Sequence, residues 1–324
     1  MTTPVHERIR ASARTQVRDG LQHLEFEAMA TRCRVVFPGT ASIANTLGRA
    51  VLDWVANFEA RYSRFLPDSL ISRINDQAGK GWVEIDAETE RIFGLCNEAV
   101  FFTRGVFDPT ALPLIKLWNW KATPPTIPDD AAIAAARRNI GWAKVQRAPG
   151  KIFLPVAGMC LDLGGIGKEY AVDQVGALAA RHGLRDVLVD FGQDVLALGT
   201  PPGRPAWHIG LEDPKQPGKC WAGVAAKNVA VATSGDYLRR FEINGRRYGH
   251  ILDIRTGYPV ANGCCAVSVI APRCTVAGLL ATSIFVLGPE EGVRMLDAIP
   301  DAAGCIVTET ARVSSRRFYE YVAS

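Results

Sequence analysis

"LDLGGIGKEYAVD", residues 161–173, predicts a strand that ends at Asp162, a glycine turn, and a helix from about Gly167. Three apolar residues continue this helix at steps of four and three positions: Ala171, Val175 and Leu178. The stretch is not a Walker A loop, which requires glycine where Asp162 stands and serine or threonine where Glu169 stands. It also lacks the Gly-x-Gly-x-x-Gly spacing of a Rossmann turn.

The glycine turn leads directly into a helix, and this arrangement attracts anions through free backbone N–H groups and the positive end of the helix dipole. Lys168 lies in the first turn of the predicted helix, where the dipole favours acidic side chains instead. A cation at this position indicates either contact with a phosphate or an acidic partner, or a lysine that simply points into solvent. The stretch alone leaves these interpretations open.

Helical patterns dominate the first part of the chain, and short strands dominate the second. Helices are predicted from Ser42, over 87–103, from Asp129 or Asp130 to Arg138, and over 275–286 and 289–297. Strands are predicted at 151–155, 159–163, twice within 186–199, at 266–271, and in 305–310 and 312–322. Asn244-Gly245, between two half-polar strands, is the dipeptide that a type I′ hairpin requires. This order predicts an α+β fold rather than a doubly wound parallel sheet.

The composition is that of a globular protein, with 48% hydrophobic and 22% charged residues among 324. A net charge of +4 without a basic run argues against nucleic-acid binding, and the eight cysteines contain no C-x-x-C zinc spacing. No apolar run is long enough to span a membrane, and the polar N-terminus lacks a secretory h-region. We therefore expect a cytoplasmic protein with a flexible tail over residues 1–22 and one folded domain over 23–324.

Short clusters of polar residues and glycine recur at the predicted strand ends. They are Asp108-Pro109-Thr110, Thr233-Ser234-Gly235-Asp236, and the segment from His250 to Asp253. Each cluster alone is typical of a structural turn, and a single histidine is more often a hydrogen-bonding residue than a catalyst. Together the clusters predict a pocket formed by loops around an extended, phosphate-bearing ligand.

Eight stretches, in this order, resemble the FAD:protein FMN transferase family (ApbE), over about residues 24–324. They are "AMATRCRVVF" (28–37), "YSRFLPDSLISRIN" (62–75), "GVFDPTALPLIKLW" (105–118), "LDLGGIGKEYAVD" (161–173), "LVDFGQDVLALG" (188–199), "VATSGDYLRRF" (231–241), "RRYGHILDIRTGYPV" (246–260) and "LLATSIFVLG" (279–288). The resemblance implies a single ApbE-like domain with mixed or antiparallel sheets flanked by helices and FAD in a central cleft. It also implies magnesium-dependent transfer of FMN from FAD to a threonine or serine hydroxyl of an acceptor flavoprotein, with release of AMP.

The resemblance also assigns roles to individual positions. It implies catalytic roles for His250 and Asp253, and metal contacts for the Gly165 carbonyl and for Thr282. It implies FAD contacts for Met29 on the adenine side, Phe65, Asp108 in the Asp-Pro-Thr turn, Asp162, Lys168, Ser234, Asp236 and Leu252.

The sequence departs from the family pattern at the expected metal site. The family places an aspartate ligand four residues before Thr282, where this chain has Gly278, and no acid between Asp253 and Glu290 takes its place. Because Mg²⁺ prefers anionic oxygen ligands, this change predicts a weakened site. Smaller departures are Ala30 and Glu169, each where glycine is usual, Gly249 where a histidine is common, and Ile254 where proline is usual.

Three functions therefore remain open from the sequence. The first is an active FMN transferase, and the second is an FAD-binding relative that has lost transfer and acts as a flavin carrier or assembly factor, an alternative that Gly278 favours. The third is a small-molecule enzyme that uses the same pocket for other phosphate chemistry. The sequence does not name the acceptor protein.

Overall fold

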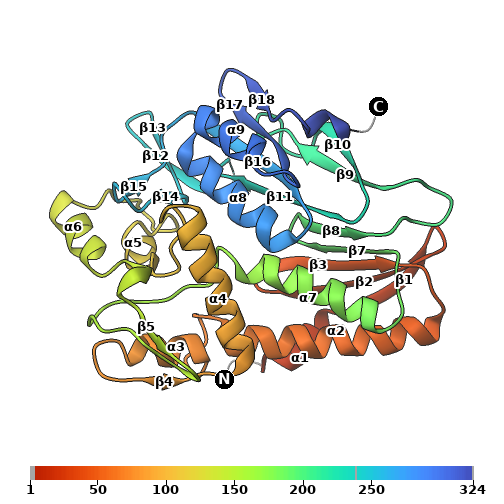
Figure 1. Ribbon diagram of the computed structural model, residues 1–324, viewed down its shortest axis with the longest axis horizontal. Helices are drawn as coiled ribbons and strands as arrows, with labels where there is room; N and C mark the ends of the chain where they lie inside the picture. Colours follow the sequence, from red (N-terminus) through yellow and green to blue (C-terminus); the bar gives the residue numbers. More distant parts are fainter. Residues whose placement is uncertain (1–3, 238, 323–324) are drawn as a thin grey trace.

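The computed structural model describes residues 4–237 and 239–322, and its centre is one nine-stranded sheet. All neighbouring strands of this sheet pair antiparallel (Figure 1). The strand order is β1 (Arg14–Arg18), β2 (Leu21–Ala28), β3 (Thr31–Phe37), β7 (Val187–Phe191), β8 (Asp194–Leu198), β11 (Val229–Gly235), β16 (Cys264–Ala271), β17 (Ala303–Thr308) and β18 (Arg312–Ser314). The predicted α+β class is confirmed, and the central sheet is purely antiparallel.

Helices cover one face of this sheet and a small hairpin covers the other. The covering helices are α2 (Ala41–Tyr62), α7 (Gly167–Arg181), α8 (Cys274–Leu287) and α9 (Pro289–Asp297) (Figure 1). Their apolar sides form the main core, with Leu47, Val172 and Ile284 fully buried. On the opposite face, the hairpin β9 (Trp207–Glu212) and β10 (Cys220–Ala226) and the short helix η2 (Phe318–Glu320) form a second core. None of the helices in the described ranges is both long and apolar enough to cross a membrane.

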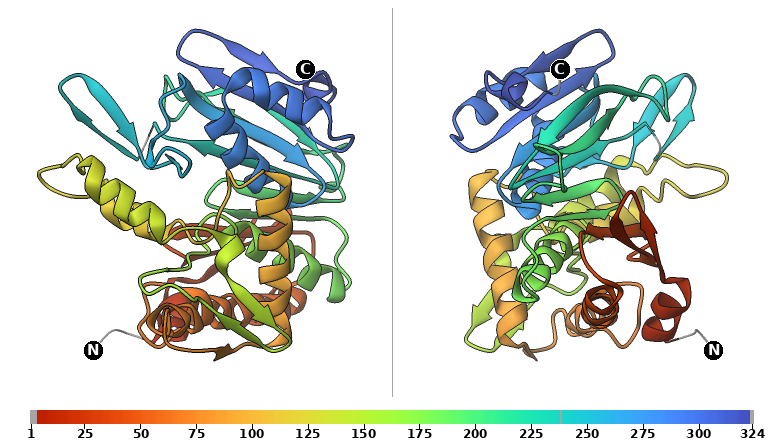
Figure 2. Two further views of the ribbon diagram at one scale, coloured as in Figure 1. Left: turned by 60° about the vertical axis from the view of Figure 1, so that its left-hand side comes forward. Right: turned by 90° about the vertical axis from the view of Figure 1, so that its right-hand side faces the viewer.

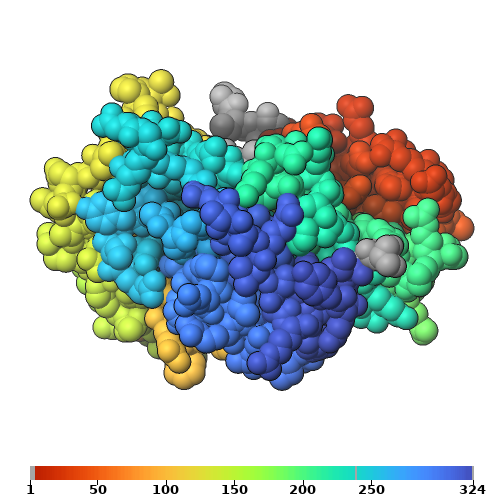
Figure 3. All heavy atoms as spheres, turned by 90° about the horizontal axis from the view of Figure 1, so that it is seen from above, coloured from red at the N-terminus to blue at the C-terminus, as the bar shows by residue number. Residues whose placement is uncertain are grey.

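A third group of elements projects from one end of the sheet. It contains α5 (Leu112–Leu117), α6 (Asp130–Arg138), the hairpin β12 (Arg240–Ile243) and β13 (Arg246–Gly249), and the pair β14 (Leu252–Asp253) and β15 (Tyr258–Pro259). Figures 2 and 3 show the yellow and cyan segments side by side at this end, although they are far apart in the sequence. Trp118 connects them, because its ring stacks on Tyr248 and its Nε1–H donates to the Gly257 carbonyl at 2.7 Å.

The remaining elements pack beside α2 and support the loops that reach the site. They are α3 (Leu70–Asp76), β4 (Val83–Glu84), α4 (Ala87–Phe102), η1 (Trp142–Lys144), β5 (Gln146–Ala148) and β6 (Lys151–Phe153). Asp86 caps α4 and Asp129 caps α6, since each side chain accepts a hydrogen bond from the third backbone N–H that follows. The predicted hairpin is also confirmed, with Asn244 at φ 52° and Gly245 at φ 74°.

The strand predicted over residues 159–163 is wrong, because this segment has no neighbouring strand in the described structure. Its backbone is satisfied in other ways. The Leu161 N–H donates to Asn75 Oδ1 at 2.6 Å, and the Asp162 N–H donates to the Pro109 carbonyl at 2.8 Å. An apolar run can therefore be extended and buried without joining a sheet, when side chains and loops supply its hydrogen bonds.

The flexible tail predicted over residues 1–22 is wrong for residues 4–22, and residues 1–3 lie outside the described ranges. This segment forms α1 (Val5–Ser12) and β1, which pairs with β2 along its whole length. Ile9 is 0% exposed within the main core, and Arg8 pairs with Glu59 of α2 at 2.5 Å. Ile9, together with the partly buried Val5, anchors this short and otherwise polar helix in the main core.

Replacing Ile9 with alanine tests whether α1 belongs to the folded unit. We expect Ile9→Ala to lower the free energy of unfolding by about 2–4 kcal/mol, because it opens a cavity in the main core. Val17→Ala is the matched control: Val17 is 64% exposed, and its loss is expected to change stability by less than about 0.5 kcal/mol. Urea denaturation measures both variants, and equal, negligible effects would show that α1 does not contribute to the core.

Candidate functional site

One large cleft, of about 1180 Å³, opens where the N-terminus of α7, helix α8, strand β11 and the loops of the projecting group meet. Strands β2 and β3 and the β7–β8 turn complete its wall. Eight of the residues predicted for the site line it: Asp108, Asp162, Gly165, Lys168, Ser234, His250, Leu252 and Thr282. The glycine turn of residues 161–173 is therefore part of a pocket wall.

The first turn of α7 faces this cleft without a side-chain cap. Ile166 occupies the N-cap position and supplies no capping hydrogen bond. In the described part of the chain, no backbone N–H donates to the Gly165 carbonyl. One position further along, the Tyr170 N–H donates to the Ile166 carbonyl. The cleft therefore has access both to helix N–H groups, which favour anions, and to one free carbonyl oxygen.

Lys168 forms an ion pair with an acidic residue of the same chain. Its Nζ forms an ion pair with the buried carboxylate of Asp194, at the start of β8. Burial favours the neutral amine, but the charges of Asp194 and Glu169 outweigh this effect and raise the pKa of Lys168. Lys168 therefore stays charged at the cleft wall, with part of its charge balanced by Asp194.

Glu169 turns toward α8 and lies against Gly278. A Cβ atom at position 278 would lie 2.5 Å from the Cγ of Glu169 and 3.1 Å from its Cδ and Oε1. Both residues line the cleft, and Glu169 is 8% exposed. Burial, followed by the charge of Asp194, raises the pKa of Glu169 to about 8. Oxygen Oε2 of Glu169 is buried and has no hydrogen-bond partner within the described residues.

Helices α7 and α8 are held in register by a second acid of α7. Asp173 accepts hydrogen bonds from the backbone N–H groups of Cys274 and Thr275, at 2.7 and 3.0 Å, and from the Thr275 hydroxyl. Glu169 lies one helical turn before Asp173, and Gly278 lies one turn after Cys274. The contact between Glu169 and Gly278 is therefore on the same facing sides of the two helices as the contact between Asp173 and Cys274. The cap at Asp173 thereby places Glu169 over Gly278.

Two hydroxyl groups lie one turn further along α8. Thr282 follows Gly278 by four residues, and its Oγ1 is 2.8 Å from Oγ of Ser234 on β11. Both side chains line the cleft. The cleft floor thus brings together oxygen atoms from α7, α8 and β11.

Asp162 and Phe65 are connected through Arg64. The Arg64 Nε is 3.1 Å from Oδ2 of Asp162, and its guanidinium lies 4.1 Å from the centre of the Phe65 ring. Asp162 and Arg64 line the cleft, whereas Phe65 does not and is 77% exposed. Phe65 therefore lies outside the cleft, against the guanidinium of Arg64, which lines it.

The Asp108 carboxylate is fully engaged in its own turn. Its Oδ1 accepts from the backbone N–H and the hydroxyl of Thr110, at 2.8 and 2.6 Å, and its Oδ2 accepts from the Trp142 N–H at 2.8 Å. This Asx turn presents backbone to the cleft rather than a free carboxylate. Asp108 thus shapes the wall, which matches the structural interpretation of its motif.

His250 reaches the cleft at the end of β13, beside Trp120. Burial, followed by the charge of Arg239, lowers the pKa of its imidazole to about 4. The imidazole is therefore neutral at pH 7, and its Nδ1 has no hydrogen-bond partner in the described ranges. A neutral imidazole with one unpartnered ring nitrogen in a cleft can accept a proton.

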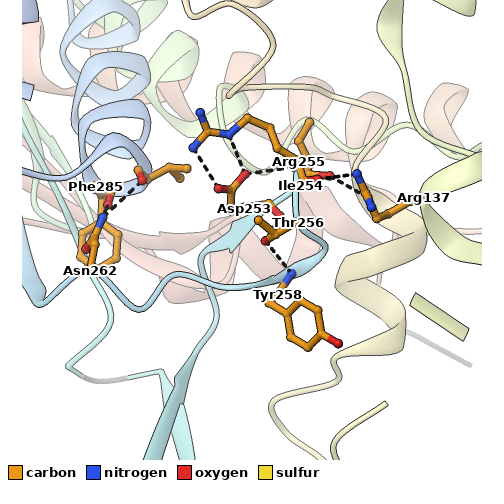
Figure 4. A network of polar contacts seen from close by, with 9 residues as sticks. Arg137, Asp253, Ile254, Arg255, Thr256, Tyr258, Asn262 and Phe285 are labelled. Carbon is orange, nitrogen blue, oxygen red and sulfur yellow. Dashed lines mark hydrogen bonds and ion pairs between the residues drawn. The ribbon is translucent and has the colours of Figure 1, made fainter. Parts of the chain in front are cut away.

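Besides Phe65, three predicted site residues do not line the cleft: Asp253, Asp236 and Met29. Asp253 instead holds its own loop, because its carboxylate accepts from the backbone N–H, Nε and Nη2 of Arg255, each at 2.9 Å (Figure 4). Asp236 is 2% exposed and pairs with Arg247 at 3.3 Å. Met29 packs on the main core, and its N–H donates to Glu59 at 2.8 Å.

Several lining residues were not predicted as site residues from the sequence. They are Arg64, Glu169, Asp194 and Arg239. Glu169 is next to Lys168, but its sequence position gave no reason to associate it with Gly278. In the described part of the chain no three side chains of His, Cys, Asp or Glu cluster as a metal site. Any metal in this cleft would therefore be held by carbonyl, hydroxyl and few carboxylate oxygens.

Comparisons with known proteins agree with this fold. The sequence model of the ApbE family matches residues 29–307. The FAD:protein FMN transferase of Treponema pallidum (strain Nichols) is 35% identical over 265 residues, which are 76% of this chain and 72% of that protein. The crystal structure of the ApbE protein of Thermotoga maritima has a TM-score of 0.86 at 30% identity, and covers 94% of this chain and 100% of its own. The chain belongs to the ApbE family.

Proposed function

We propose that this chain is an FAD:protein FMN transferase, which moves FMN from FAD to a threonine or serine hydroxyl of an acceptor flavoprotein and releases AMP. The observation that carries the proposal is the cleft itself, which gathers the predicted Asp162, Lys168, Ser234, His250 and Thr282 in one space. Its volume of about 1180 Å³ suits an extended ligand of dinucleotide size. The names of the similar transferases support the same activity.

The cleft offers positive charge for the two phosphates of FAD. Arg64, Lys168 and Arg239 line it, and the uncapped first turn of α7 faces the same space. Charged donors and helix N–H groups stabilise a pyrophosphate best when they are fixed in advance. Here Asp162 orients Arg64 and Asp194 orients Lys168.

His250 is the group best suited to take the proton of the acceptor hydroxyl. As the hydroxyl oxygen attacks the FMN phosphorus, the bond from that phosphorus to the bridging oxygen of the pyrophosphate breaks, and AMP leaves. The hydroxyl proton passes to the neutral imidazole of His250. Asp253 acts as a positioning residue, because its carboxylate holds Arg255 and thereby the loop that follows His250.

Magnesium fits the donors of this cleft. The free Gly165 carbonyl and the hydroxyl groups of Ser234 and Thr282 are hard oxygen atoms, as Mg²⁺ prefers. When bound, the ion would neutralise charge on the FAD phosphates. This donor set needs a carboxylate to hold the ion firmly.

One observation, the glycine at position 278, favours the alternative of an FAD-binding protein without transfer activity. Such a protein would bind FAD in the same cleft and leave the acceptor unmodified. Transfer itself therefore separates the two functions, whereas FAD binding does not.

The direct test of transfer incubates the full chain with FAD, Mg²⁺ and a flavinylation-acceptor domain. We expect the acceptor to gain the mass of a covalent FMN in intact-protein mass spectrometry, with AMP appearing in equal amount. An acceptor of unchanged mass at every Mg²⁺ concentration, with FAD bound to the protein, would favour the carrier alternative instead.

Substitution of His250 tests its role as the proton acceptor. We expect His250→Asn to lower the transfer rate by about 10²–10⁴-fold with little change in the dissociation constant of FAD. Asp253→Asn is the contrasting variant, because it loosens the following loop without removing the base. A His250→Asn protein that transfers FMN at the normal rate would rule out this assignment.

The buried His250 also predicts how stability depends on pH. In the unfolded chain its imidazole takes up a proton near pH 6.5, but in the folded protein only near pH 4. The unfolded state therefore binds more protons between these values, so His250 lowers the free energy of unfolding as pH falls from 6.5 to 4, by at most about 3 kcal/mol. Urea denaturation of His250→Asn should show a shallower loss over this range, and parallel curves for the two proteins would contradict it.

A further inference from the structure

Glu169 and Gly278 depend on each other. The Glu169 side chain crosses from α7 to α8 and occupies the space where a side chain at position 278 would begin. A Cβ atom there would lie only 2.5 Å from the Glu169 Cγ, a separation that carbon atoms do not tolerate. Glycine at 278 is therefore the condition for a carboxylate from α7 to reach this point.

The Glu169 carboxylate is left incompletely satisfied by the protein. Its Oε2 is buried without a hydrogen-bond partner in the described ranges, while the nearby Lys168 ammonium pairs with Asp194. A buried polar oxygen with no partner destabilises the folded protein, and more strongly when it is charged. Such a group in a cleft wall indicates that something outside the chain completes its coordination.

The atoms around this carboxylate are suited to a hard cation. Thr282 lies one turn from Gly278 on the same side of α8, with the Ser234 hydroxyl 2.8 Å from its own. The Gly165 carbonyl, at the entrance to α7, accepts no backbone hydrogen bond in the described ranges. All four residues line the same cleft. Together they offer one carboxylate, one carbonyl and hydroxyl oxygens, with room for waters and phosphates, which is a donor set for Mg²⁺ or Mn²⁺.

We propose that Glu169 supplies the carboxylate ligand of a divalent-cation site on the cleft floor, from α7, in place of an acid on α8 at position 278. The proposal rests on the proposed function for the phosphates that would complete the coordination. In this proposal, glycine at 278 leaves space for the Glu169 ligand and does not indicate that the metal site has lost its carboxylate. No acid lies between Asp253 and Glu290 to compensate for Gly278, but Glu169 comes from a distant part of the sequence.

The site can be tested by Mn²⁺ binding, independently of transfer. Free Mn²⁺ is measured by electron paramagnetic resonance during titration of the full chain, once without FAD and once with FAD at saturation. In whichever form the unaltered protein binds Mn²⁺, we expect Glu169→Gln to bind it at least about tenfold more weakly. Glu88→Gln, which removes an acid of α4 outside the cleft, should bind like the unaltered protein.

A paired exchange guards against the possibility that Glu169→Gln merely disturbs the fold. Glu169→Gly combined with Gly278→Asp moves the carboxylate from α7 to α8, and should restore Mn²⁺ affinity to within about threefold, while Glu169→Gly alone should not. Gly278→Asp alone should destabilise the protein, because the new side chain collides with Glu169.

The outcomes separate this proposal from the proposed function. Equal Mn²⁺ affinity of Glu169→Gln and the unaltered protein, or no Mn²⁺ binding in either form, would overturn the metal site. Mn²⁺ binding that depends on Glu169, in a protein that leaves its acceptor unmodified, would support the site and reject the transferase.

Discussion

The close approach of α7 and α8 at Glu169 and Gly278 is the constraint on which the cleft floor depends. Asp173 caps α8 and fixes the register of the two helices, and glycine at 278 then lets the Glu169 side chain lie flat across α8. The same register keeps Thr282 on the side of α8 that meets β11.

The chemistry of the cleft comes from pairing most of its charges in advance. Asp194 fixes Lys168, Asp162 fixes Arg64, and Asp190 fixes Arg34, so these three cations of the cleft are held before a ligand arrives. His250 and Glu169 are the two exceptions, since each keeps a buried polar atom without a partner in the described ranges. Polar groups that the fold leaves unsatisfied at a cleft wall are the groups a ligand can use.

Local signals in the sequence predicted most of the fold. The Asn244-Gly245 turn and the start of the helix at Asp129 or Asp130 depend on neighbouring residues alone; the turn is confirmed, and the structure places the cap at Asp129. The strand over 159–163 and the loose segment over 4–22 are wrong for the same reason. Whether an extended run finds a partner strand, or a short polar helix finds a core, depends on residues far away in the chain.

The same distinction between local signals and distant contacts applies to the residues of the candidate site. Several residues inside recognisable motifs, such as Lys168, Ser234 and His250, line the cleft. Phe65 and Asp253 fall in equally clear motifs but outside it, because a motif fixes a loop and not the direction of each side chain. The relation between Glu169 and Gly278 joins positions more than a hundred residues apart, and only the packing of two helices reveals it.

The most direct measurement is a crystal structure of the protein with FAD and Mn²⁺, with the metal located by its anomalous scattering. Our account predicts an anomalous peak on the cleft floor about 2 Å from a carboxylate oxygen of Glu169, shared with the Thr282 hydroxyl or the Gly165 carbonyl. A peak whose coordination shell excludes Glu169, or a Glu169 side chain turned away from the metal, would contradict it.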